Sequence, residues 1–252
     1  MMLLDVGNSA VKWAVEENGR YTCRGYFLRR NRGFAELADA AWGQLPVPDG
    51  VAVANVAGQE LQREINDWVA ARWQLSPCYI HVDKAAAGVV NAYTDPGRLG
   101  VDRWAALVAA RHAAPGPVCI IDCGTAITID ALAADGRHLG GMIAPGLKMM
   151  RQTLSADTSD IGPQPGMQGT GIGLLAQDTA QAVNNGISYM VAAMIDRVLA
   201  DIVAELGEQT AMLITGGDAG RILPLLGWQP HHDPDLVLKG IAILVGEEAC
   251  VM

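Results

Sequence analysis

Two stretches of the chain repeat one another: Leu3–Arg20 (LLDVGNSAVKWAVEENGR) and Ile120–Arg137 (IIDCGTAITIDALAADGR). Written one above the other without gaps, they align Asp5 with Asp122, Gly7 with Gly124, Gly19 with Gly136 and Arg20 with Arg137. Each copy has an apolar run ending in a carboxylate, a Gly with a small polar neighbour, a second apolar run and an Asn-Gly or Asp-Gly turn, which is typical of a β-hairpin. The repeat therefore predicts two hairpins that begin two related halves.

The boundary between the halves is predicted near residues 113–117 (AAPGP), where Pro and Gly punctuate the chain most strongly. We therefore expect domains at 1–114 and 115–252. In the first domain, Glu60–Trp73 has helical spacing of its apolar residues. Extended runs in this half are predicted at Tyr21–Leu28, Val51–Val56 and Tyr79–Val82.

In the second domain, an apolar-periodic stretch from about Leu174 to Leu206 is too long for one ordinary helix, so we expect a break at Gly186. Ala211–Thr215 is predicted as a buried strand, followed by a short helix, and Leu236–Glu247 as the C-terminal helix. Strands and helices thus alternate in both halves, and we predict two α/β domains that face a cleft.

Composition excludes several classes of protein. Half of the 252 residues are hydrophobic and 18% are charged, which is typical of a globular chain. The net charge of −9 repels nucleic acid and anionic membrane surfaces, so neither is expected as a partner. The N-terminal apolar run ends at Asp5, too early for a signal peptide or a spanning helix. Together with five scattered cysteines, this predicts a cytoplasmic protein.

The two hairpin turns are candidates for binding phosphate. Gly allows close approach of the backbone, N–H and hydroxyl groups donate hydrogen bonds, and a carboxylate at the strand end can hold a metal ion or its waters. Asn8, Ser9 and Lys12 add donors in the first copy, and Thr125 and Thr128 in the second. A single Asp-x-Gly turn could merely close a hairpin, and Lys12 could be a solvated strand residue, but the duplication favours binding. Neither a P-loop nor a Rossmann fingerprint is supported.

A third candidate is the loop 93–103 (YTDPGRLGVDR), which leads into a helical stretch at Trp104–Ala110. It places Asp102 beside Arg103 at the start of the helix, a pair that suits a polar small molecule. An Asp in a first helical turn can equally be a cap or a partner of the helix dipole.

Taken together, these motifs resemble those of the type III pantothenate kinases, in the actin/hexokinase-like (ribonuclease H-like) superfamily. The resemblance spans nearly the whole chain. It rests on Asp5–Lys12, on Tyr93 with Gly100–Arg103, on Ile121–Ala126 with Thr128 and Asp130, and on Gly140–Gly146 (GGMIAPG). It implies two related domains with mixed sheets flanked by helices, and ATP-dependent phosphorylation of pantothenate. Magnesium and a monovalent cation, potassium or ammonium, are implied as cofactors.

The resemblance also implies roles for individual residues. Asp102 resembles the catalytic base, and Asp122 the site of the monovalent cation. Thr125 is similar to a second ATP contact. ATP binding is implied for Asp5, Val6, Gly7, Asn8, Ser9, Ala10, Val11 and Lys12, and substrate binding for Tyr93, Gly100, Val101, Asp102, Arg103 and Thr179. Ser9 stands where many members have Thr, which keeps the hydroxyl.

Other expectations remain open at this point. The family's dimer implies a subunit interface on the stretch Leu174–Leu206; the alternative is a helix buried in its own domain. Residues such as Ile187, Met190, Met194 and Ile195 would form that interface. Gly216–Asp218 is similar to an adenosine-side loop or is a plain turn. The stretch Ser155–Gly173 departs from the family pattern. No histidine is assigned a role. Rival functions are a non-catalytic ATP-binding regulator of this fold and a kinase acting on another hydroxylated metabolite.

Overall fold

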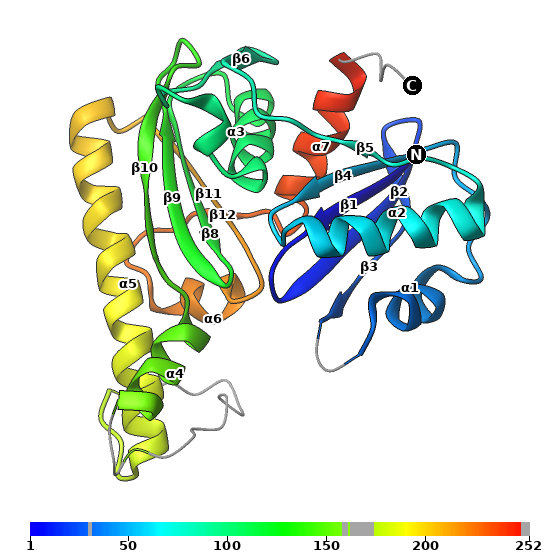
Figure 1. Cartoon of the computed structure of the whole chain (residues 1–252). Helices are drawn as coiled ribbons and strands as arrows, with labels where there is room; N and C mark the ends of the chain where they lie inside the picture. Colours follow the sequence, from blue (N-terminus) through cyan, green and yellow to red (C-terminus); the bar gives the residue numbers. More distant parts are fainter. Residues whose placement is uncertain (30–31, 158–160, 162–173, 248–252) are drawn as a thin grey trace. The chain divides into compact units, whose positions relative to one another are not determined.

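The computed structural model describes residues 1–29, 32–157, 161 and 174–247, and Figure 1 shows their elements. The chain divides into two compact units. The first unit holds Met1–Ala113, the short segment Gly136–His138 and the C-terminal part from Asp235 onward. The second unit holds Ala114–Asp135 and Leu139–Pro234. The C-terminal helix therefore belongs to the first unit, whereas the sequence-based division at residue 114 places it in the second domain.

The first unit is built on a five-stranded mixed sheet with the order β3-β2-β1-β4-β5. β1 pairs with β2 and β2 with β3 in antiparallel fashion, while β4 and β5 continue the sheet in parallel. The strands are β1 (Met2–Val6), β2 (Ala10–Glu17), β3 (Arg20–Leu28), β4 (Val51–Asn55) and β5 (Cys78–Tyr79). The predicted hairpin at Leu3–Arg20 is confirmed, whereas only Tyr79 of the extended run predicted at Tyr79–Val82 lies in a strand.

One face of this sheet is covered by α1 (Phe34–Trp42) and α2 (Gln59–Trp73), which bury an aromatic core. Trp42 is fully buried at its centre, with ring centroids 5.4 Å from Trp68 and 5.4 Å from Phe27. Aromatic side chains bury large apolar areas, so this cluster supplies much of the stability of the unit. The helix predicted at Glu60–Trp73 is confirmed.

The first unit is completed by α3 (Val101–Ala113) and α7 (Leu236–Glu247), which pack against each other and against β4. A Cβ added at Gly240 would collide with the backbone of Ala105, so only glycine allows this close helix crossing. The short strands β6 (Ala85–Ala86) and β7 (Val89–Val90) form a hairpin, and the 3₁₀ turn η1 (Pro96–Arg98) leads into α3.

The second unit repeats the strand order of the first: β10-β9-β8-β11-β12. β8 and β9 are antiparallel, whereas β11 is parallel to β8 and β12 to β11. The strands are β8 (Val118–Cys123), β9 (Ala126–Leu132), β10 (His138–Pro145), β11 (Ala211–Thr215) and β12 (His231–His232). The second predicted hairpin and the strand at Ala211–Thr215 are thus confirmed.

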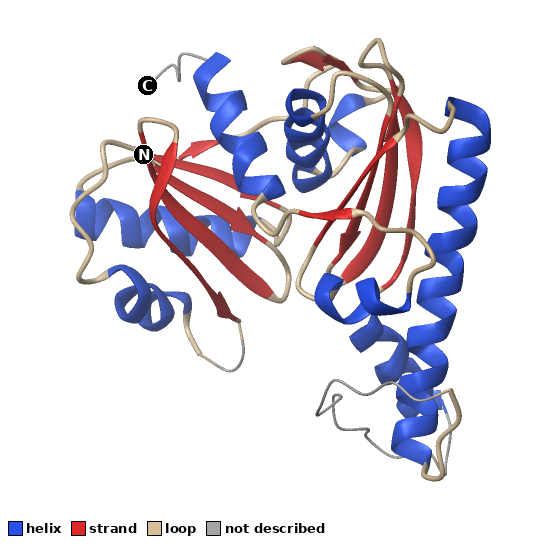
Figure 2. Cartoon of the chain, turned by 180° about the vertical axis from the view of Figure 1, so that it is seen from behind, coloured by secondary structure: helices blue, strands red, loops and turns tan. Residues whose placement is uncertain are grey.

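Helices of the second unit are α4 (Leu147–Asp157), α5 (Thr179–Leu206) and α6 (Ala219–Ile222), with the 3₁₀ turn η2 (Leu223–Leu225). α5 runs along the sheet, as Figure 2 shows, and packs an aliphatic stripe against β8 and β9. It is one continuous helix of 28 residues, so the predicted break at Gly186 is wrong. A helical Gly costs only about 1 kcal/mol relative to Ala, which the packing of this stripe outweighs.

The described residues also bear on the expected environment of the protein. Within 1–29, 32–157 and 174–247, no helix is both long and apolar enough to cross a membrane. Cys23, Cys119 and Cys123 are free thiols, while Cys250 lies outside the described residues.

Candidate functional site

The first candidate turn joins β1 to β2. The backbone N–H of Gly7 donates to Ala10 O at 3.0 Å, and Val6 pairs with Val11, so four residues, 7 to 10, form the turn. A Cβ at Gly7 would lie 3.3 Å from Ala10 O, which leaves little room for a side chain there. The turn is thus a tight backbone loop of the kind that a phosphate can approach closely.

Side chains around this turn divide between the core and the opposite face of the sheet. Val6 and Val11 are buried in the aromatic core, so only their backbone groups remain for a ligand. Asp5 and Lys12 are direct partners in the antiparallel register, and their side chains therefore lie on the other face, both half-buried. This pairing brings a carboxylate and an ammonium group to the same end of the hairpin.

Arg29 is a residue at this turn that the sequence analysis missed. Its backbone N–H donates to Ser9 O at 3.0 Å, and its guanidinium reaches Gly7 O at 3.4 Å and Asn8 O at 3.3 Å. The guanidinium thus places a positive charge beside the turn, which favours an anionic ligand. The residue lies outside both copies of the repeat, at the end of β3, so no motif indicated it.

The second candidate element is the start of α3. Asp102 lies in its first turn, where the helix dipole favours negative charge, and its Oδ1 accepts a hydrogen bond from the Arg103 N–H at 2.7 Å. A Cβ at Gly100 would clash with this carboxylate oxygen. Gly100 and the helix start therefore fix the direction in which the Asp102 carboxylate points.

Arg103 and Tyr93 form a direct pair. The Arg103 guanidinium donates to the Tyr93 hydroxyl at 3.1 Å and lies 5.8 Å from the centre of the tyrosine ring. Arg103 is 7% exposed, which is low for a guanidinium without a special role. The structure thus brings together Tyr93 and Arg103, two residues to which the family resemblance assigns substrate binding, with Asp102 adjacent in the chain.

The loop that bears Tyr93 is held by two residues that the sequence analysis did not single out. Asn91 is buried and its Oδ1 accepts from the Tyr93 N–H at 2.9 Å, which is an Asx turn. Lys84 donates to Asn91 O at 2.8 Å and to Tyr93 O at 3.2 Å. The sequence Asn91-Ala-Tyr93 was the available signal, because Asn commonly bonds to the backbone two residues on.

The second hairpin turn joins β8 to β9 and is one residue shorter than the first. Gly124 N–H donates to Ala126 O at 3.0 Å, and Cys123 pairs with Ile127. The Gly146 N–H donates to Thr125 O at 3.0 Å. A Cβ on Gly146 would collide with the carbonyl oxygens of Gly124 and Thr125, so the turn lies directly against the backbone at the end of β10.

Asp122 lies on a polar face of the second sheet. In the strand registers it is flanked by Thr128 of β9 and Thr215 of β11, whose side chains share its face. Thr215 is fully buried, and its hydroxyl has no hydrogen-bond partner among the described residues. Hard cations take oxygen ligands, and an unsatisfied hydroxyl beside a carboxylate fits such an ion. In the described part of the chain there is no group of three or more His, Cys, Asp or Glu that could hold a metal ion.

A second carboxylate, Asp218, lies close to this end of the sheet. Its N–H donates to Cys123 O at 2.9 Å, and burial raises its pKa, opposed by the positive charges of Arg221 and Arg151. Burial, with the nearby charges of Asp122 and Asp218, raises the pKa of the Cys123 thiol to about 12. The carboxylates of Asp122 and Asp218 thus lie near the buried thiol of Cys123, and a bound cation would stabilise their negative charges.

Gly216, at the start of the Gly216–Asp218 turn, has φ +96°, and a Cβ there would collide with the Asp122 carboxylate. Packing against Asp122 therefore requires a glycine at this position, whether or not the turn also binds a nucleoside.

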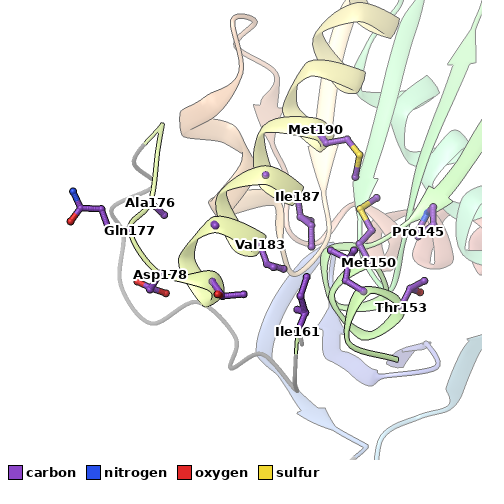
Figure 3. Close-up of a pocket in the computed structure, with 14 residues that line it drawn as sticks. Pro145, Met150, Thr153, Ile161, Ala176, Gln177, Asp178, Val183, Ile187 and Met190 are labelled. Atoms are coloured by element: carbon purple, nitrogen blue, oxygen red, sulfur yellow. The ribbon is translucent and has the colours of Figure 1, made fainter. Parts of the chain in front are cut away.

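Thr179 is the first residue of α5 and belongs to the second unit, whereas Tyr93 and Gly100–Arg103 belong to the first. It lines an open cavity of about 910 Å³ in the second unit. Figure 3 shows Val183 and Ile187 of α5 pointing toward Met150 of α4 and Ile161 across this cavity. The lining is predominantly apolar and suits hydrocarbon rather than phosphate.

Three further points of the sequence analysis have different outcomes. Of the stretch Ser155–Gly173, residues 155–157 end α4, and apart from Ile161 the rest lies outside the described residues. Ile187 and Ile195 are buried in the core of their own unit, so the prediction that they face a partner subunit is wrong. His138, to which no role was assigned, is buried with its ring stacked on Tyr93.

Comparison with known proteins gives consistent results. The family model described as type III pantothenate kinase matches residues 1–201. A protein of Nitrosococcus oceani named type III pantothenate kinase is 41% identical over 96% of this chain and 92% of its own length. One of the same name from Halorhodospira halophila is 38% identical over 95% of each chain.

Among solved structures, a candidate 2-dehydro-3-deoxygalactonokinase from Sinorhizobium meliloti matches with a TM-score of 0.60 over 97% of this chain and 95% of its own. Its 13% identity shows a shared fold and nothing more specific. The likeness agrees with the duplicated mixed sheets and with the actin/hexokinase-like fold class expected from the sequence.

Proposed function

Because the chain belongs to the type III pantothenate kinase family, we propose that it transfers the terminal phosphoryl group of ATP to pantothenate, the first step of coenzyme A biosynthesis. The observation that supports this most strongly is the similarity itself, at 41% identity over nearly the full length of both chains. The pairing of Arg103 with Tyr93 beside Asp102 supports it independently, since it gathers a carboxylate and a cation for a polar substrate.

In the proposed reaction, the primary hydroxyl of pantothenate attacks the γ-phosphorus of ATP. The bond from that phosphorus to the bridging oxygen breaks, ADP leaves, and Asp102 accepts the hydroxyl proton. The hydrogen bond from the Arg103 N–H to Asp102 Oδ1 orients the carboxylate for this task. Arg103 binds a polar or anionic part of the substrate, with further contacts from Tyr93, Gly100, Val101 and Thr179.

ATP is the proposed co-substrate, and the first hairpin turn is its proposed phosphate site. Backbone groups from Asp5 to Lys12 would approach the phosphates, and the Lys12 ammonium and Arg29 guanidinium add positive charge. Thr125 is proposed as a second ATP contact.

Cations complete the proposal. Asp5 would hold magnesium or its waters, and Asp122 with Thr215 would hold potassium or ammonium. When bound, these ions neutralise part of the charge of the phosphates.

The experiment that tests the function measures phosphate transfer from ATP to pantothenate by the purified protein with magnesium, with and without potassium. We expect formation of 4′-phosphopantothenate that potassium stimulates. Asp102→Asn should lower turnover by roughly 10²–10⁴, the usual contribution of a general base, without unfolding the protein.

Asp95→Asn is the matched control, because it removes the same charge in the segment before α3, at an exposed position whose side chain caps no helix. It should retain wild-type turnover. Near-normal turnover in Asp102→Asn would contradict the assignment of the base, whereas absence of product from the wild-type protein would support the non-catalytic regulator. Turnover of another hydroxylated metabolite in place of pantothenate would support the second rival.

We further propose a homodimer, formed through the exposed part of α5 and the open edge of the second sheet. Met190 on α5 is 54% exposed, and Met142 and Ile143 on the edge strand β10 are 52% and 65% exposed. Apolar side chains gathered on an unpaired strand edge commonly mark an interface. Light scattering should give twice the chain mass of 26.6 kDa, and Met190→Glu should shift the mass toward the monomer. A monomeric wild-type protein at working concentration would overturn this proposal.

A further inference from the structure

His138 is a buried residue whose ring lies flat against a substrate-binding residue. It is the first residue of β10 and is 4% exposed. Its ring is stacked on that of Tyr93, with centroids 6.1 Å apart and an angle of 11° between the planes. Offset-stacked aromatic pairs stabilise one another beyond their buried area, so each ring restricts the orientation of the other.

The fold delivers His138 to this position by a tightly docked turn. Gly136–His138 group with the first unit, although the strands on either side belong to the second. Val90 N–H donates to Gly136 O at 3.0 Å, and Val90 forms a parallel bridge with Arg137. Gly136 has φ +86°, and a Cβ there would collide with the carbonyl oxygen of Gly88. The turn is thus anchored on β7, directly before the Tyr93 loop.

The tyrosine that His138 contacts is itself the partner of the substrate-binding guanidinium. Arg103 donates to the Tyr93 hydroxyl at 3.1 Å, so the position of the tyrosine side chain sets where this hydrogen bond lies. Asn91 and Lys84 fix the backbone of Tyr93, but they do not fix its ring. The contacts of the Tyr93 ring with His138 and Arg103 restrict where the side chain can lie.

We propose that His138 is a positioning residue for the substrate: its ring holds the Tyr93 ring, which in turn aims Arg103 at the polar part of pantothenate. This inference rests on the proposed function. His138 acts through Tyr93 rather than on the reacting atoms, so its loss should weaken the productive binding of pantothenate and leave the phosphoryl-transfer step and ATP binding nearly unchanged.

The test compares His138→Ala with His138→Phe, which keeps a flat ring for stacking. His138→Ala should raise the KM for pantothenate about two- to tenfold, the range of an aromatic pair, with kcat and the KM for ATP changed less than about twofold. His138→Phe should return the pantothenate KM to within about twofold of wild type. A role limited to filling space would instead move the unfolding midpoint and all three kinetic constants together.

A double-mutant cycle with Tyr93→Ala separates the proposed route from any other. If His138 acts through Tyr93, His138→Ala should have almost no further effect on the pantothenate KM in the Tyr93→Ala background. Additive effects, or no rescue by His138→Phe, would overturn the inference while the activity of the wild type still upheld the function. An inactive wild-type protein would remove the proposed function and this inference with it.

Discussion

The two copies of the repeat differ in their first turns, which we call the near turns: the turn between β1 and β2 is one residue longer than the turn between β8 and β9. The gapless alignment of the two sequences does not reveal this difference. In the first, Gly7 N–H donates to Ala10 O; in the second, Gly124 N–H donates to Ala126 O, one residue sooner. The alignment matches Ser9 with Ala126. By backbone hydrogen bonds, however, Ser9 corresponds to Thr125, because each of their carbonyls accepts from the residue after the third strand, at 3.0 Å.

This difference teaches that the repeat preserves a hydroxyl rather than a spacing. Ser9 and Thr125 both stand immediately before the second strand of their hairpins, and Asn8 is the additional residue of the first turn. The second turn of each copy, which we call the far turn, joins the second strand to the third. It consists of Asn18–Gly19 in the first copy and of the longer segment 133–137 in the second, and this added length brings Gly19 and Gly136 back into alignment. Each unit thus presents a hydroxyl side chain at the same place in its own first turn.

The far turns differ more strongly, in their surroundings. Gly19 has φ +75°, and a Cβ added there would meet nothing within 4 Å, whereas Gly136 has φ +86° and lies against Gly88. The first turn therefore only closes a hairpin, and the second also holds His138 against Tyr93.

The largest expected effect that sharpens this comparison is that of Gly136→Ala. The left-handed backbone costs about 1–2 kcal/mol for a residue with a Cβ, and overpacking against Gly88 adds about 1–3 kcal/mol. Denaturant unfolding should report this loss of stability, and the pantothenate KM should rise because the turn displaces His138.

Gly19→Ala is the matched control, with the same backbone region but open space around it. It should cost only about 1–2 kcal/mol and leave both Michaelis constants at their wild-type values. Equal effects of the two substitutions on stability and on pantothenate binding would break the comparison.

A smaller contrast is expected at the near turns. Gly146→Ala places a Cβ against the carbonyls of Gly124 and Thr125, and should cost about 1–3 kcal/mol in the free energy of unfolding. Arg29→Ala, at the corresponding place in the first copy, removes two long hydrogen bonds and should cost about 0.5–1.5 kcal/mol. The order would be reversed if the backbone at Gly146 could retreat freely, which thermal and denaturant unfolding would both reveal.

Local sequence patterns predicted the strands well. The hairpins, the helix at Glu60–Trp73 and the C-terminal helix follow from alternation, periodicity and turn residues, and all are confirmed. The actin/hexokinase-like fold class expected from the resemblance is confirmed too. The break at Gly186 was wrong because tertiary packing of α5 overrides the propensity of a single exposed glycine.

Residues of the candidate site were predictable only where a motif contained them. Asp102 and Arg103 are adjacent in the chain, so their proximity needed no structure. Arg29 and His138 reach the site through pairing between distant segments, and nothing in their neighbouring residues indicates that partnership. The spacing of apolar residues could not predict whether Ile187 is buried in its own unit or exposed, because α5 has apolar residues on more than one face.

The aromatic core of the first unit makes the two units optically unequal. Of the six tryptophans, Trp228 belongs to the second unit, and the first unit holds Trp13, Trp42, Trp68, Trp73 and Trp104. Trp42, Trp68 and Trp73 lie with ring centroids 4.8–6.2 Å apart, close enough for their excited states to couple. Near-ultraviolet circular dichroism and tryptophan emission therefore report almost only on the first unit. A denaturation curve measured by either signal describes the unfolding of that unit and not of the second.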